Sequence, residues 1–175
     1  MIADVVYALL LLFAATLGEL LLDSIGLSLP LIGLLCFYLA IAQGRWTGLG
    51  AAVLGGAALD FLLAREQPVS VLLFIFIVVL AELWLRKMEN PEAAVLLCIP
   101  GALIPLIAWL PWAIPAWDPA KPWFDSLVDS LVSALVASIC SAVLLPVVVL
   151  ALDYFGSRLE LSLFSTAKER LAGAK

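Results

Sequence analysis

The sequence predicts an all-α integral membrane protein with six transmembrane helices and both termini in the cytoplasm. The chain of 175 residues is 65% hydrophobic and only 13% charged, whereas soluble domains are about 45–50% apolar and about 25% charged. Three long runs contain no Asp, Glu, Lys or Arg, namely 24–44, 93–117 and 130–152. Each run reaches the roughly 18–20 residues that a helix needs to cross a bilayer. These runs therefore predict three spans directly.

The other three spans follow from shorter charge-free runs that apolar residues extend past a flanking charge. The first span has no Lys or Arg before its apolar core, so it lacks the basic region of a cleavable signal peptide and is expected to remain in the mature protein. The third continues past Asp60 and the fourth past Glu82. In chain order, the expected spans are 3–22, 28–43, 47–63, 68–85, 93–114 and 125–152.

Prolines mark the last two spans. Pro100, Pro105 and Pro111 fall in the fifth span and Pro146 in the sixth. Each proline removes one helical hydrogen bond and favours a bend. Bent helices can line a cavity or simply wrap a compact bundle, and the prolines alone do not separate these two cases.

The basic residues predict which side of the membrane each connection faces. Because cytoplasmic connections carry an excess of Lys and Arg, the side with more of them is taken as the inner one. That rule places both termini inside. The inner residues are Arg45, Arg86, Lys87, Arg158, Lys168, Arg170 and Lys175, and the outer ones are Arg65 and Lys121.

The chain divides into a six-helix transmembrane domain, 1–155, and a cytoplasmic tail, 156–175. Leu161, Phe164 and Leu171 recur in the tail at near-helical intervals among basic residues. This spacing is typical of a short helix lying on the inner leaflet, although a solvated tail accounts for it equally well. The connections between spans are short, so we expect no separate soluble domain.

Two stripes of small residues predict close contacts between helices. In a bilayer, helices associate by close approach of their backbones, which small residues four positions apart permit. One stripe begins before the third span and continues into it, and the other runs along the sixth span. Either stripe can pack within the chain or receive a helix of a partner protein. Their members are Gly44, Gly48, Ala52 and Gly56 in the first, and Ser126, Ser130, Ala134, Ser138 and Ala142 in the second.

Asp60 is the acidic residue with the strongest case for a functional role. An acid at the bilayer centre costs about 2.5–3.5 kcal/mol, close to what the apolar residues of the third span return. Asp60 must therefore lie near the outer surface or be buried against a partner group. Glu82 lies four residues before Arg86, which predicts an ion pair on one helix face, and Glu19 is expected to mark the outer end of the first span.

Several classes of function are excluded by what the chain lacks. It contains no histidine, which removes the commonest general base and metal ligand. It has no phosphate-binding loop, nucleophile elbow or metalloprotease motif. Three separate cysteines predict no metal or redox site. We therefore expect no enzymatic activity and no cofactor. A pI near 4.5 argues against a nucleic-acid partner.

Two stretches resemble a known family. They are "GRWTGLGAAVLGGAALDFLLAREQPVSVLLF" and "LLPVVVLALDYFGSRLEL". The first is similar to the glycine-rich helix ending in an Asp of the MreD family, the small polytopic subunit of the bacterial rod-shape system. The second is similar to that family's closing helix, with its leading proline, its Asp and its basic tail. The family pattern has glycines in the turn after the first Asp, where this chain has Ala64 and Pro68.

The resemblance implies a non-enzymatic scaffold in the bacterial inner membrane. Its partners would be the bilayer and the transmembrane helix of an MreC-like single-span protein, and indirectly MreB, RodA and a penicillin-binding transpeptidase. The first contact candidates are Gly44, Gly48, Ala52, Gly56 and Asp60. The family also looks similar in fold to the substrate-binding subunits of energy-coupling-factor transporters. That likeness supplies an alternative, in which the bent fifth helix and Asp60 would line an outward-facing vitamin pocket.

Overall fold

Six α-helices follow one another in the described part of the chain, which contains no strand. The computed structural model describes residues 2–26, 29–64, 69–87, 94–113, 123–159, 161 and 163–167. The all-helical fold predicted from the sequence is thus confirmed for these residues. The helices are α1 (Ile2–Ser24), α2 (Leu31–Ala42), α3 (Arg45–Leu62), α4 (Val69–Lys87), α5 (Ala94–Ala113) and α6 (Trp123–Arg158).

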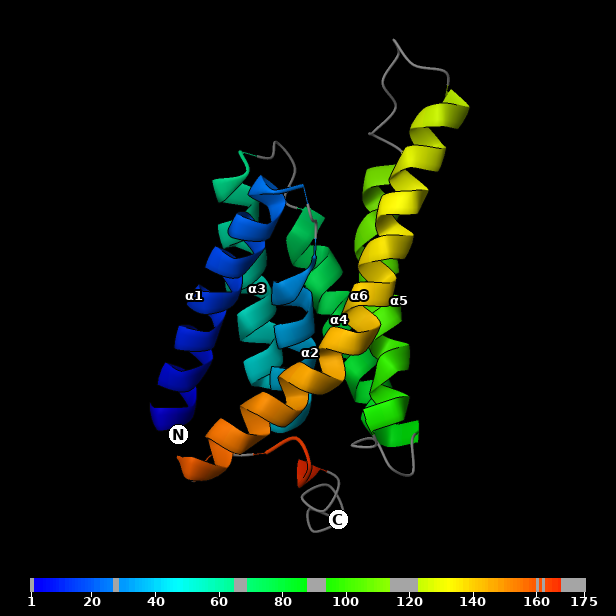
Figure 1. Cartoon of the computed structure of the whole chain (residues 1–175). Helices are drawn as coiled ribbons and strands as arrows, with labels where there is room; N and C mark the ends of the chain where they lie inside the picture. The colour runs from blue at the N-terminus through cyan, green and yellow to red at the C-terminus, as the bar shows by residue number, and fades with distance from the viewer. Residues whose placement is uncertain are drawn as a thin grey trace.

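Helix α2 lies at the centre of the bundle (Figure 1). Every residue from Ile32 to Ala42 is buried, and the helix is apolar on all sides, a pattern that suits a protein core as well as contact with lipid. With 12 residues it is about 18 Å long, shorter than the roughly 30 Å of a bilayer core. The predicted span 28–43 was therefore too long. Pro30 precedes the first residue of the helix. The helix ends at Ala42, and the chain turns at Gln43 and Gly44.

Helices α1, α3 and α4 pack around α2 (Figure 1). Gly55 of α3 faces both α1 and α2, because a Cβ built there would lie 2.7 Å from Ile32 Cγ2 and 2.9 Å from Leu12 Cδ1. Such distances leave no room for a side chain at this position. The absence of a side chain at Gly55 is what lets three helices meet at this depth, the packing mode expected where lipid replaces water.

Helices α5 and α6 form a separate pair that packs mainly along each other (Figure 1). The closest approach is at Gly101, where a Cβ would lie 2.6 Å from the carbonyl oxygen of Ser141. The Ser138 hydroxyl also donates a hydrogen bond of 2.7 Å to the carbonyl oxygen of Ala102. Two of the five residues of the predicted stripe in the sixth span, Ser138 and Ala142, therefore contact α5 within this pair.

Helix α6 is longer than the predicted span 125–152, since it contains 36 residues. Its two halves run at an angle to each other (Figure 1). Pro146 lies inside the helix and removes one main-chain hydrogen bond, which accounts for the predicted bend. In α5 the helix continues through Pro100 and Pro105 without a break.

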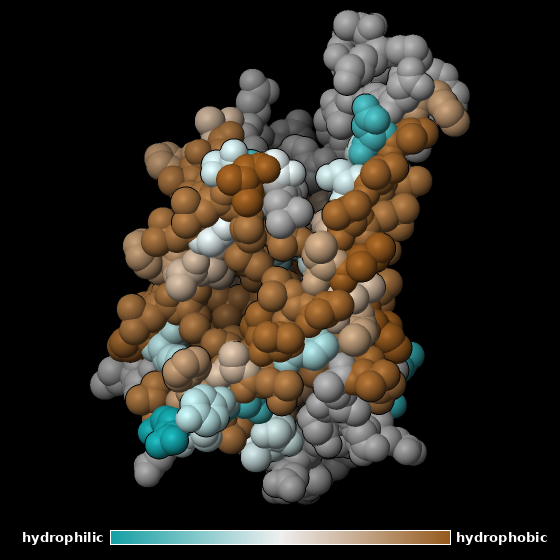
Figure 2. Space-filling view, in the orientation of Figure 1, coloured by the Kyte–Doolittle hydropathy of each residue, from teal (hydrophilic) through white to brown (hydrophobic). Residues whose placement is uncertain are grey.

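The outer surface of the bundle is apolar. Figure 2 shows hydrophobic residues over the middle of one face and the most hydrophilic ones toward its two ends. Exposed side chains on this surface include Phe13, Leu72, Ile139 and Leu150. Within the described part of the chain, three helices are long and apolar enough to cross a membrane, namely Asp4–Ser24, Val69–Lys87 and Val128–Arg158. These observations indicate a membrane protein, while crossing by α2, α3 and α5 stays a prediction.

The described part of the tail packs onto the bundle instead of lying apart from it. Helix α6 continues past residue 155 to Arg158. Phe164 and Ala167 are then buried in the core cluster. The Phe164 ring stacks on Tyr38, with ring centroids 6.2 Å apart. The first part of the predicted tail 156–175 thus closes the end of the bundle at which α2 finishes.

Some predictions concern residues outside the described part of the chain. They include most of the outer connection at 115–123. They also include Arg65, Lys121, Lys168, Arg170, Leu171 and Lys175.

Candidate functional site

The predicted contact stripe of α3 packs inside the bundle. At Gly48 a Cβ would lie 2.6 Å from Ala40 Cβ and 2.8 Å from Ala40 Cα, so α3 approaches α2 closely at this glycine. At Gly56 a Cβ would lie 2.7 Å from both the Cα and the nitrogen of Val71, which brings α3 against the backbone of α4. Ala52, between them, is fully buried. These three residues therefore serve contacts within the chain.

The two ends of the stripe have different roles. Gly44 precedes α3 with a φ of 100°, a conformation that favours glycine, and open space lies around it. Asp60, at the other end, is only 5% exposed. A partner that approaches α3 from outside would first meet exposed residues such as Trp46, Val53 and Phe61. Contact of a partner with the stripe itself stays a prediction.

Asp60 caps the start of the neighbouring helix. Its Oδ2 accepts a hydrogen bond of 3.1 Å from the main-chain N–H of Ser70, in the first turn of α4. The first N–H groups of a helix have no partner within the helix, and they carry a partial positive charge that favours an anion. The sequence predicted that Asp60 lies either near the outer surface or buried against a partner group. The structure places it in a buried position. The hydrogen bond to Ser70 N is a reason for its burial within the chain.

Two further acids that the sequence did not single out as caps bind main-chain groups in the same way. Glu19 Oε2 accepts a hydrogen bond of 3.0 Å from Ile32 N at the start of α2. Asp153 Oδ1 accepts from Phe164 N at 2.9 Å, and its Oδ2 accepts from Ser165 N at 3.0 Å. Each acid lies 10–13 positions before its donor. An acid near the end of one helix, followed by a turn and a segment without its own capping side chain, is the signal that could have identified them.

Replacing Asp60 by leucine is expected to lower the free energy of unfolding by about 1–3 kcal/mol, because the buried N–H of Ser70 loses its acceptor. Asparagine keeps an acceptor oxygen and loses only the charge, so Asp60→Asn is expected to cost less than about 1 kcal/mol. Thermal melting in a mild detergent measures both. Equal melting of Asp60→Leu and the unsubstituted chain would contradict the capping role.

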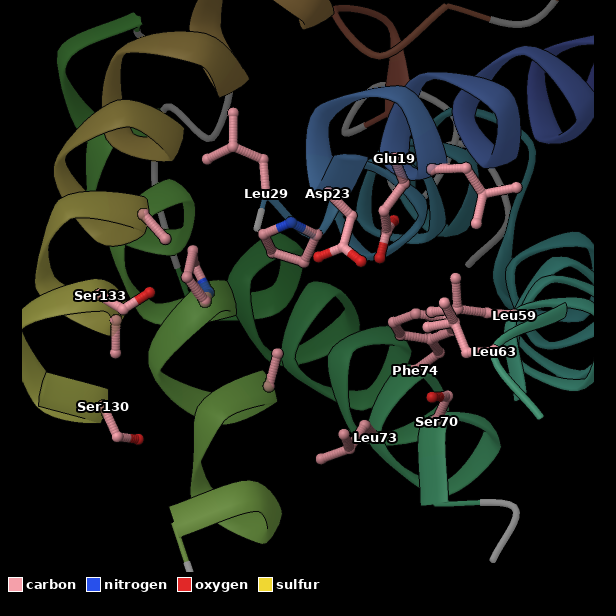
Figure 3. A pocket seen from close by; sticks show the side chains of 16 residues that line it. Glu19, Asp23, Leu29, Leu59, Leu63, Ser70, Leu73, Phe74, Ser130 and Ser133 are labelled. Carbon is pink, nitrogen blue, oxygen red and sulfur yellow. The ribbon is translucent and has the colours of Figure 1, made fainter. Parts of the chain in front are cut away.

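An open pocket of about 320 Å³ lies between the α5–α6 pair and the remaining helices. Figure 3 shows Glu19 and Asp23 of α1 beside each other on one side, and Ser130 and Ser133 of α6 on another. The rest of the lining is largely apolar, and it includes Pro105 of α5. The pocket thus combines apolar walls with two carboxylates one helical turn apart.

The α6 wall of this pocket consists of small residues. They occupy positions that repeat every four residues, which leaves a shallow face rather than projecting side chains. The four that line the pocket are Ser130, Ser133, Ala134 and Ala137. Ser130 and Ala134 of the predicted stripe thus line the pocket. Further along α6, Ser138 of the stripe and the neighbouring Ser141 are buried beside α5.

Glu82 of α4 forms the predicted ion pair with Arg86. Glu82 Oε2 lies 4.0 Å from Arg86 Nη2, and its Oε1 lies 3.8 Å from Arg45 Nε at the start of α3. The first contact confirms the predicted pair, and the second links α4 to α3. Among the described residues, no group of three His, Cys, Asp or Glu side chains could hold a metal ion.

No protein-family model matches the chain, and neither the curated proteins nor the solved structures contain a match. The residues and their geometry are therefore the basis for any assignment of function.

Proposed function

We propose that this chain is a polytopic protein of the bacterial inner membrane with six spans and both termini on the cytoplasmic side. Three helices with the length and apolarity of a span support this proposal. Arg45 and Arg86 share one carboxylate at the end of the bundle where α2 finishes. Figure 1 places the start of α1 and the end of α6 near that same end. Clustering of basic residues there is what the positive-inside rule expects of a cytoplasmic face.

Within that membrane we propose a non-enzymatic scaffold of the cell-shape machinery. It would bind the transmembrane helix of an MreC-like protein and so connect MreB filaments with the RodA and transpeptidase wall synthase. The observation that carries this proposal is the open pocket with a small-residue wall on α6. Small residues at this spacing let a second helix approach closely in lipid. The rest of the lining is largely apolar, so a transmembrane partner would contact apolar walls apart from Glu19 and Asp23.

One further observation supports the resemblance from which the scaffold role follows. Ala64, in the turn after Asp60, has a φ of 48°. This left-handed conformation favours glycine over any residue with a Cβ. The turn geometry is thus the one for which the family pattern uses glycine, and this chain forms it with alanine.

The alternative function is a substrate-binding membrane subunit of a vitamin transporter. The same pocket favours it, because about 320 Å³ lies within the roughly 300–1,000 Å³ typical of small-ligand sites. Glu19 and Asp23 would supply polar contacts there. Asp60 is not among the lining residues. In the alternative function the carboxylate contacts to a substrate would therefore come from α1 and not from Asp60 of α3.

Substitution of Ser133 by leucine separates the two functions. Ser133 is exposed and lines the pocket, so the larger side chain is expected to block it without disturbing the core. A scaffold is expected to lose about tenfold in capture of a co-expressed MreC-like protein, equivalent to about 1.4 kcal/mol. Co-purification from detergent-solubilised membranes measures this loss.

The control is Ala151→Leu, a similar enlargement at an exposed α6 position outside the pocket, which is expected to leave capture unchanged. Equal capture by Ser133→Leu and the unsubstituted chain would remove the pocket from the scaffold role. A melting shift of the unsubstituted chain with a vitamin, lost in Ser133→Leu, would instead establish the alternative.

A further inference from the structure

A second pocket opens at the end of the bundle where α2 finishes. It has a volume of about 290 Å³ and lies between the end of α2, the start of α3 and the end of α4, with Ala167 beside it. Its charged lining residues are Arg45, Glu82 and Arg86. Two guanidinium groups against one carboxylate leave a surplus of one positive charge. Neither candidate function above uses this pocket.

The two arginines are not saturated by Glu82. The Arg45 Nε–Glu82 Oε1 distance is 3.8 Å, and the Arg86 Nη2–Glu82 Oε2 distance is 4.0 Å, both longer than a charge-assisted hydrogen bond of about 2.7–2.9 Å. Both guanidinium side chains are at least half exposed, at 52% and 70%. Exposed ion pairs of this kind contribute little to the free energy of folding. An anion between the two arginines can therefore displace them from Glu82 at low cost.

The start of α3 adds main-chain donors to the same pocket. This helix begins at Arg45 without a hydrogen bond from a capping side chain, so the N–H groups of its first turn favour an anion. Gly44 has no Cβ and lies in open space, which leaves the approach to this turn unobstructed. Phosphate oxygens are acceptors that suit both guanidinium groups and helix starts.

The neighbouring Trp46 indicates the depth of the pocket in the membrane. Its side chain is 75% exposed, and the guanidinium carbon of Arg45 lies 4.8 Å from the centre of its ring. Exposed Trp residues concentrate at the level of the lipid headgroups. The pocket mouth therefore faces the layer in which phosphodiesters are the most abundant anions.

We propose that this pocket binds the phosphodiester of an anionic phospholipid. Arg45 and Arg86 hold the phosphate oxygens, the first turn of α3 donates from its main chain, and Trp46 packs against the upper part of the acyl chains. Glu82 competes with the phosphate for the two arginines. This site is independent of the proposed partner, because it lies at the other end of the bundle from the pocket that carries the scaffold role.

The test uses the full chain in a neutral detergent with added phosphatidylglycerol, phosphatidylcholine or inorganic phosphate. Native mass spectrometry counts bound lipid, and thermal melting reports stabilisation. The unsubstituted chain is expected to bind phosphatidylglycerol in preference to phosphatidylcholine. The double variant Arg45→Gln with Arg86→Gln is expected to bind it about tenfold more weakly, because two charge-assisted contacts are lost. Glu82→Gln is expected to bind it several-fold more tightly, because a competing carboxylate is removed.

Arg158→Gln is the matched control. Arg158 is an exposed arginine whose Nη2 lies 3.2 Å from the Tyr154 hydroxyl, and it is not part of the pocket. This variant is expected to bind phosphatidylglycerol within about twofold of the unsubstituted chain. The double variant removes two charges and Arg158→Gln removes one. A loss of about threefold in Arg158→Gln beside about tenfold in the double variant would show that net charge alone attracts the lipid, and would overturn the site. Stabilisation by inorganic phosphate as strong as that by phosphatidylglycerol would overturn the lipid assignment.

Discussion

Replacing Phe164 by alanine is expected to lower the free energy of unfolding by about 3–5 kcal/mol, the cost of removing a large aromatic side chain from a packed core. Phe164 is 1% exposed and lies between Tyr38 and Phe37, with ring centroids at 6.2 Å and 6.5 Å. No neighbouring helix can refill this space without losing its own contacts with α2. Thermal melting in detergent measures the effect.

The matched control is Phe155→Ala, on the last turns of α6. Phe155 is 59% exposed, so its loss is expected to cost less than about 1 kcal/mol. Equal melting temperatures for the two variants would show that the 163–167 segment does not pack on the bundle in solution. A drop confined to Phe164→Ala would place this segment within the folding unit.

Asp153 holds the same segment by a different interaction. Its two carboxylate oxygens accept from Phe164 N and Ser165 N, and Oδ1 also accepts from the Tyr38 hydroxyl at 3.1 Å. Tyr38 belongs to the central helix, so one acid joins α6, α2 and the tail. These hydrogen bonds fix the 163–167 segment to the end of the bundle that carries Arg45 and Arg86, and Ala167 of this segment lines the proposed lipid pocket.

Hydropathy was sufficient to predict the number and order of the helices. Long apolar runs with few charged residues can be read along the chain without knowing any contact. The boundaries were less accurate where a helix end depends on neighbouring elements. Helix α2 is shorter than expected, and α6 extends to Arg158, where the chain turns back and packs against α2.

The arrangement of the helices could not be read in this way. In lipid the buried and exposed faces of a helix are both apolar, so nothing in the sequence of α2 marks it as the central helix. The small residues of α3 did indicate close packing, and α3 approaches α2 closely at Gly48 and α4 closely at Gly56. Which helix each would contact depends on the whole arrangement.

The position of the pocket beside α6 also depends on the arrangement of the helices. Its wall on α6 was visible as a stripe of small residues, but the opening exists because the α5–α6 pair is separated from α1 at that level. Asp60 was correctly expected to be either shallow or partnered, yet its partner is a main-chain N–H. Main-chain groups carry no signal in the sequence, so a carboxylate that caps a distant helix looks like an isolated charge.

Substitution of Gly56 by alanine is expected to destabilise the chain by about 1–3 kcal/mol, the usual cost of overpacking a tight contact. The added Cβ would lie 2.7 Å from Val71 Cα and Val71 N. These are backbone atoms of α4, which cannot rotate away as a flexible side chain can. Relief requires α3 and α4 to separate, and that movement would also strain the hydrogen bond from Ser70 N to Asp60.

Gly50→Ala tests the same chemical change on the same helix with the opposite expected sign. No atom lies within 4 Å of a Cβ built at Gly50, and alanine favours a helix over glycine by up to about 1 kcal/mol. The melting temperature is therefore expected to fall for Gly56→Ala and to rise slightly for Gly50→Ala. An unchanged melting temperature for Gly56→Ala would show that Gly56 does not form the contact between α3 and α4. A loss with Gly50→Ala as large as with Gly56→Ala would show that the contact with Val71 is not the cause. In either case Gly56 would be open to the partner-binding role predicted for Gly44, Gly48, Ala52, Gly56 and Asp60, because a small residue that is not needed for internal packing can receive a second helix.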